Sequence, residues 1–94
     1  MENKIDISID PAISGGKYSN LVVITHSNSE FIMDFAQNMP GMKAQVISRI
    51  ILTPDHAKRL LSALRDNIEK YEDQYGEIPI AKGTYKIPVE TAQA

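Results

Sequence analysis

Three side chains around one predicted turn are candidate ligands for a metal ion. His26 precedes the turn at residues 27–29, and Glu30 and Asp34 follow it. A histidine and two carboxylates are ordinary metal ligands, and such a set would suit a small enzyme whose site forms between two subunits. Glu30 should lie near His26 across a tight turn, but Asp34 lies farther along the strand, and structural metal sites usually have more ligands. We therefore predict no metal and no cofactor, and interpret these residues as the polar end of a hairpin.

Other signals for catalysis are weaker. Ser27 and Ser48 lack the flanking glycines of a nucleophile elbow. The Gly15–Gly16 pair before Lys17 lacks the spacing of a phosphate-binding loop and precedes a predicted strand instead of a helix. The chain has no cysteine, which excludes a thiol nucleophile, a thiolate zinc site and a disulfide framework. We predict no catalytic residues and expect that the protein is not an enzyme.

The charge balance argues against nucleic acid as a partner. Ten Lys and Arg face twelve Asp and Glu, for a net charge of −2, whereas phosphate binding needs a dense basic surface. The alternative is a small nucleic-acid-associated regulator with a basic patch of Lys43, Arg49, Lys58, Arg59 and Arg65. No apolar run approaches the ~20 residues that span a bilayer. We expect a soluble protein of the cytoplasm that does not associate with membranes.

The element that must position any site is a helix from Thr53 to Gly76. Thr53 suits the N-cap, Pro54 suits the first helical position, and Gly76 suits the end. Apolar residues recur at helical spacing and form one stripe: Ala57, Leu60, Leu61, Leu64, Ile68, Tyr71 and Tyr75. The helix should therefore bury one face in a core.

Before the helix, the pattern predicts strands at residues 4–10, 18–26, 30–37 and 43–52, separated by turn-forming residues. Residues 11–17 are predicted to be a flexible connection. The fold class is α+β: an antiparallel meander of three to four strands, with the long helix packed on the face that carries Phe31, Met33 and Phe35. Residues 1–76 form one small domain. Residues 77–94 form an extended or disordered tail, which could instead add an edge strand.

One helix can cover only one face of this sheet, yet the other face is also apolar. We assign Ile32, Ile47, Arg49 and Ile51 to that second face and predict that it is a homodimer interface. The alternative is that the N-terminal strand or the tail covers it. Arg49 should pair with Asp34 or Glu30, or else extend its stem over apolar surface to reach water. The predicted function is a non-enzymatic, homodimeric protein-interaction module, with an unknown protein partner possible.

The central part of the chain also resembles a known family. Its most specific pieces are YSNLVVITHSNSEFIMDF, the RIILTP junction and the helix ending in KYE, within residues 18–72. These resemble the family called domain of unknown function three-four-six-seven, which comprises short, uncharacterised bacterial and archaeal proteins. The resemblance implies a small strand-rich domain with one C-terminal helix and implies no activity. Residues 1–16 and 77–94 lie outside it.

Overall fold

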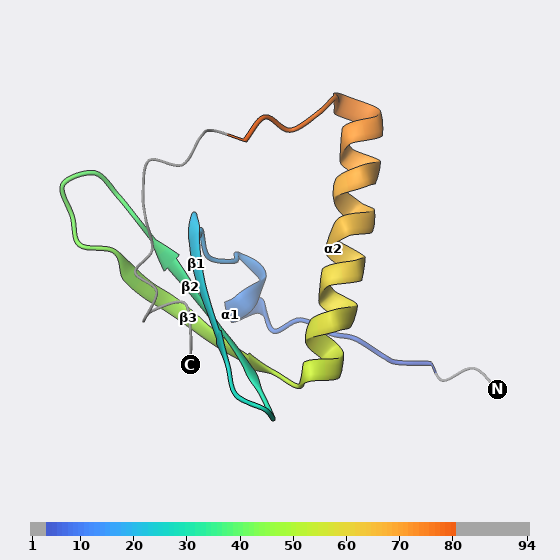
Figure 1. Ribbon diagram of the computed structural model, residues 1–94, viewed down its shortest axis with the longest axis horizontal. Helices are drawn as coiled ribbons and strands as arrows, with labels where there is room; N and C mark the ends of the chain where they lie inside the picture. The colour runs from blue at the N-terminus through green and yellow to red at the C-terminus, as the bar shows by residue number, and fades with distance from the viewer. Residues whose placement is uncertain (1–3, 81–94) are drawn as a thin grey trace.

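The protein consists of a three-stranded antiparallel sheet followed by one long helix (Figure 1). A computed structural model describes residues 4–80. The strands β1 (Leu21–His26), β2 (Phe31–Gln37) and β3 (Gln45–Leu52) lie in the order β1-β2-β3. The short helix α1 (Pro11–Ser14) precedes the sheet and the helix α2 (Pro54–Tyr75) follows it. The α+β class, the meander and the long helix are thus confirmed.

The strand register divides the sheet into two faces. Met33 pairs with Ile24 on one side and with Ile50 on the other, and residues that pair directly point to the same face. We call the face with Phe31, Met33 and Phe35 the inner face, because α2 lies on this side of the sheet. The opposite side, which carries Ile32 and Asp34, is the outer face.

Helix α2 begins and ends as its sequence predicts. The Thr53 hydroxyl oxygen accepts a hydrogen bond from the His56 backbone N–H at 3.2 Å, and Pro54 occupies the first turn. At the other end, Gly76 has a φ of 97°, a conformation that side chains with a Cβ rarely adopt. An exposed ion pair joins Asp55 to Arg59 one turn on. The local sequence therefore specifies the position of this helix.

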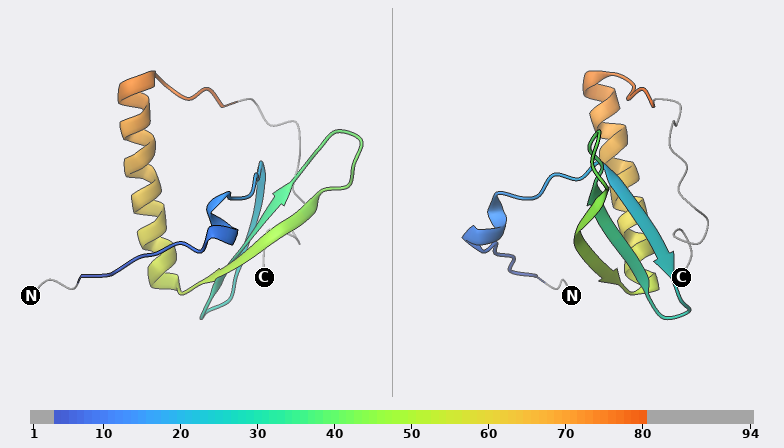
Figure 2. Two further views of the ribbon diagram at one scale, coloured as in Figure 1. Left: turned by 180° about the vertical axis from the view of Figure 1, so that it is seen from behind. Right: turned by 90° about the vertical axis from the view of Figure 1, so that its left-hand side faces the viewer.

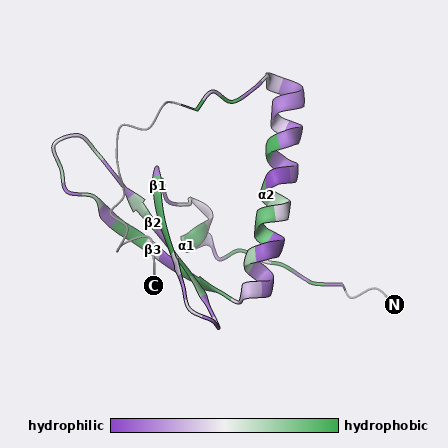
Figure 3. Ribbon diagram, in the orientation of Figure 1, coloured by the Kyte–Doolittle hydropathy of each residue, from purple (hydrophilic) through white to green (hydrophobic). Residues whose placement is uncertain are grey.

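The axis of α2 diverges from the sheet, so the two elements form an open V that meets at the Leu52–Pro54 junction (Figures 1 and 2). In Figure 3 the hydrophobic side of α2 is turned toward the sheet, and its hydrophilic side is turned away. Among residues 4–80, the only hydrophobic side chains with less than a tenth of their surface exposed are Ala36, at 3%, and Leu52, at 8%. The predicted helix-on-sheet contact is thus limited to the first turns of α2.

The N-terminal segment departs from the prediction. Residues 4–10 have the extended conformation that the alternating pattern implies, but they pair with no strand in the described part of the chain, so the predicted first strand is wrong. The predicted flexible connection contains α1 instead. The Asp10 carboxylate accepts a hydrogen bond from the Ala12 N–H at 2.8 Å and caps this helix, and Pro11 fills its first position. This turn of helix directs the preceding residues away from the sheet.

At the other end of the chain, residues 77–80 contain neither helix nor strand. The Ile78 N–H donates a hydrogen bond to the Glu72 carboxylate at 2.8 Å, which holds the chain next to the end of α2. The rest of the predicted tail, residues 81–94, lies outside the described residues. The prediction of a single domain at residues 1–76 followed by a tail stays a prediction.

The cap at Thr53 provides a test of the strand-to-helix junction. We expect Thr53→Ala to lower the free energy of unfolding by about 1 kcal/mol, because the first turn of α2 loses its hydroxyl acceptor. Thr53→Ser is the matched control and should retain most of the stability. Urea denaturation followed by circular dichroism measures both. Equal midpoints for the alanine and serine variants would show that the cap does not set the start of the helix.

Candidate functional site

The apolar surfaces that line the V form the candidate site to which both α2 and the sheet contribute. At the closed end of the V, a cavity of about 300 Å³ lies between the first turns of α2 and the inner face. The helix contributes Ala57, Leu60, Leu61 and Leu64, and the sheet contributes Ile24, Phe31 and Met33. Phe31 also stacks on His26, with 5.4 Å between the ring centroids. This end of the V is the one place where the described residues bring α2 and the sheet together.

Farther along α2, the same apolar stripe has no partner within the described part of the chain. Ile68, Tyr71 and Tyr75 are all exposed, and the rings of Tyr71 and Tyr75 lie against each other, at 4.9 Å between centroids. Ile50 on the inner face is also exposed. Two apolar surfaces of one chain therefore face a common open space without filling it.

A second cavity, of about 520 Å³, lies between α1 and the inner face near β3. Ala12 and Ile13 of α1 line it together with Phe35 and Ile47 of the sheet. The Lys17 amine donates a hydrogen bond to the Ile47 carbonyl oxygen at 3.3 Å, which holds the connection beside β3. Helix α1 is thus placed on the β3 side of the molecule.

The outer face is organised around an ion pair. Arg49 donates two hydrogen bonds to Asp34, from Nε to Oδ1 at 2.7 Å and from a terminal nitrogen to Oδ2 at 2.9 Å. The pairing of Arg49 with Asp34, one of its two predicted partners, is thus confirmed. These hydrogen bonds lower the pKa of the Asp34 carboxyl, and burial opposes the shift. The same pair raises the pKa of Arg49.

The four predicted interface residues do not all lie on one face. Ile32 pairs directly with Ile51, and Arg49 is on the same face beside them. A register shift between Phe35 and Ala36 skips Ile47, which lines the α1 cavity with Phe35 instead. The outer face therefore joins three of the four residues, and the bulge places Ile47 on the inner side. Strict alternation along a strand does not reveal such a shift.

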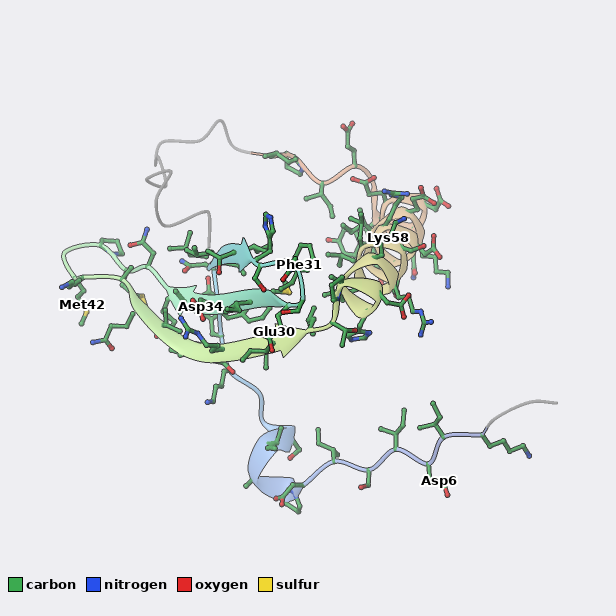
Figure 4. All side chains as sticks on the ribbon, turned by 60° about the horizontal axis from the view of Figure 1, so that its bottom comes forward. Asp6, Glu30, Phe31, Asp34, Met42 and Lys58 are labelled. Carbon is green, nitrogen blue, oxygen red and sulfur yellow. The ribbon has the colours of Figure 1, made fainter. Side chains whose placement is uncertain are left out.

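The candidate metal ligands are separated. His26 lies on the Phe31 side of the sheet, whereas Asp34 lies on the outer face and is bound by Arg49. Glu30 lies in the turn just before β2, and Figure 4 shows it apart from Asp34. Within residues 4–80, no three histidine, aspartate or glutamate side chains group in a way that could hold a metal ion. One chain by itself does not bring the three predicted residues together.

The basic residues of the nucleic-acid alternative are scattered. Figure 4 shows Met42, the neighbour of Lys43, at one end of the molecule and Lys58 at the other. Arg49 is paired with Asp34, and Arg59 with Asp55. The described residues therefore present no continuous basic patch made of the five predicted side chains. No helix among them is long and apolar enough to cross a membrane.

The fold and these surfaces define a small α+β chain with unfilled apolar faces. The model of the family described as Protein of unknown function (DUF3467) matches residues 1–80, so the chain belongs to this family. The match includes residues 1–16 and 77–80, which the resemblance based on residues 18–72 had left outside. No curated protein and no solved structure is significantly similar to this chain.

The Arg49–Asp34 pair provides a test by titration. We expect the carboxyl carbon of Asp34 to titrate below its ordinary pKa of 3.8, because Arg49 stabilises the charged form. Since the pKa in the folded protein is lower than in the unfolded chain, the carboxylate stabilises the fold at neutral pH. That contribution is lost as the pH falls through the folded pKa. Carbon-13 NMR of the carboxyl groups measures the midpoint.

Arg49→Gln should return the Asp34 midpoint to about its ordinary value. The matched control is Arg59→Gln, which removes an arginine from the other ion pair and should leave the Asp34 midpoint unchanged. An Asp34 midpoint that is the same in the wild type and in Arg49→Gln would contradict the assignment.

Proposed function

We propose that this protein is a homodimeric protein-interaction module with no enzymatic activity. One observation carries the proposal: α2 and the inner face present apolar surfaces toward each other but meet only at one end of the V. A chain of 94 residues has a thin core even when it is fully packed. An occupant of the V would complete that core.

The stability of α2 supports the same conclusion. In proteins, most of the stability of a helix comes from the packing of its amphipathic face and not from helix propensity. Beyond the cavity at the closed end, α2 has no such packing within residues 4–80. Its polar side, which carries Asp66 and Lys70, is suited to water. The stripe with Ile68 and Tyr71 therefore needs another surface.

A second copy of the chain supplies that surface. In a two-fold dimer the same two surfaces meet twice. The helix stripe of each copy can therefore pack on the apolar sheet face of the other copy. Each α2 would lie in the V of its partner, with its stripe against the partner's inner face. A stable interface of standard size removes about 800 Å² from each partner. The half-exposed Leu, Ile and Tyr side chains along the V provide apolar surface of that order.

This arrangement differs from the sequence prediction, which placed the homodimer contact on the outer face, and it leaves that face free for a different protein. Ile51 is exposed beside Ile32, and the two hydrogen bonds from Arg49 to Asp34 fix the position of the arginine side chain on this surface. A mixture of apolar side chains and one oriented arginine is typical of protein contact surfaces. The separation of His26, Glu30 and Asp34 supports a binding role over an enzymatic one, and the absence of cysteine suits the reducing cytoplasm.

The oligomeric state tests this proposal. Light scattering over a range of concentrations should give twice the chain mass of 10.5 kDa. Ile68→Asp should shift the mass toward that of one chain, because a charge would be buried in the interface. Ile68 lies beyond the cavity at the closed end of the V, so this variant spares the contact within one chain. Circular dichroism at 222 nm verifies that the helix is retained.

Two control variants locate the contact. Ser62→Asp introduces the same charge on the polar side of α2 and should leave the dimer intact. Ile51→Asp introduces it on the outer face and should also leave the dimer intact. If Ile51→Asp alone gives a monomer, the dimer contact lies on the outer face. A wild-type mass of one chain at every concentration would refute the homodimer.

A further inference from the structure

The N-terminal arm, residues 4–10, has the form of a strand without a sheet. Its backbone is extended, and its isoleucines alternate with polar residues. Ile5, Ile7 and Ile9 are 78%, 86% and 63% exposed, so none of them is buried by the described part of its own chain. Figure 4 shows the arm, marked by Asp6, running clear of the sheet. The family model that matches residues 1–80 includes the arm. These features are typical of a segment that pairs with the edge of a β-sheet.

The outer edge of β1 is the strand edge best suited to accept it. β1 pairs with β2 through its whole length without a bulge, and LVVITH contains no acid, no lysine, no arginine and no proline. Charges, prolines and bulges are the features that protect free edges from pairing. β3 carries two such features, Arg49 and the register shift opposite Phe35 and Ala36, and Lys17 already binds its Ile47 carbonyl. Of the two edges of this sheet, only that of β1 lacks such protection from residues 4–80.

The arm does not reach the outer edge of its own β1. It leaves from α1, which lies beside β3, where Ala12 and Ile13 line a cavity with Ile47. Two strand spacings, about 10 Å, separate β3 from β1. Figure 4 shows the arm on the β3 side of the sheet, with β1 on the far side. With the arm directed away from the sheet in this way, the β1 edge that it can pair with is that of another molecule.

We propose that the N-terminal arm of one copy adds a fourth strand to the β1 edge of a second copy, and that the second copy returns the contact. This inference rests on the proposed homodimer. Main-chain hydrogen bonds would supply the pairing, and the three isoleucines would extend one apolar face of the partner's sheet. Seven arm residues match the six residues of β1. The exchange would give hydrogen-bond partners to the backbone of the β1 edge, and the same contact would cover the exposed isoleucines of the arm.

The chain has no cysteine, so introduced cysteines can report on this contact. Ile7→Cys protein is unfolded and refolded together with Val23→Cys protein, and separately with Ile24→Cys protein, and each mixture is then oxidised with glutathione disulfide. Val23 and Ile24 point to opposite faces, so one of them lies on the side that the arm's isoleucines occupy. We expect a species of twice the chain mass in one of these mixtures, with mass spectrometry showing a disulfide between the cysteine introduced in the arm and the cysteine introduced in β1.

Val46→Cys is the matched control, because Val46 is 56% exposed on β3, the other edge strand. Its mixture with Ile7→Cys should lack the mixed disulfide. A link to Val46 at equal yield, or no link to either β1 position, overturns the strand exchange. If the wild type is still a dimer in that case, the proposed function stands without it. A wild-type monomer refutes both.

Discussion

The direct junction between β3 and α2 is the constraint on which the rest of this structure depends. Leu52 ends the last strand as one of the two most buried hydrophobic side chains described, and Pro54 already occupies the first turn of the helix. Thr53 is the single residue between them, and its hydroxyl caps the helix. With no loop to reverse the chain, the direction of β3 and the fixed φ of proline set the direction of α2.

The shape of the molecule follows from this junction. Because α2 leaves the sheet at an angle, it contacts the inner face only near Phe31 and Met33, and the rest of its stripe stays in water. The arm of residues 4–10 is a second uncovered apolar element, directed away from the sheet by the turn of α1. Both uncovered elements support, for the same reason, the proposal that a second copy of the chain covers them. The hydrophobic effect leaves few large apolar surfaces of soluble proteins uncovered, and this chain has no further element within residues 4–80 to cover them.

The predictions succeeded where the information is local. The ends of α2 are set by Thr53, Pro54 and Gly76, and the Arg49–Asp34 pair follows from neighbouring strands in a tight meander. They failed where a pattern specifies conformation but not a partner. The alternation at residues 4–10 correctly indicates an extended chain, but a strand also needs a free edge within reach. Likewise, alternation in β3 places Ile47 with Arg49, whereas the register shift moves it to the inner side.

The sequence by itself determined the α+β class, the meander, the long helix and the lack of a strong catalytic signal, because helix caps, turn residues and hydrophobic periodicity act over a few neighbouring residues. Only the tertiary structure decided the angle between α2 and the sheet, the position of Ile47 on the inner side, and which sheet edge within residues 4–80 lacks protection. These depend on the relative placement of elements that are distant in the chain. That placement depends on the proline-fixed junction between β3 and α2 and on the register shift in β3. A local sequence pattern does not specify how either of them affects packing.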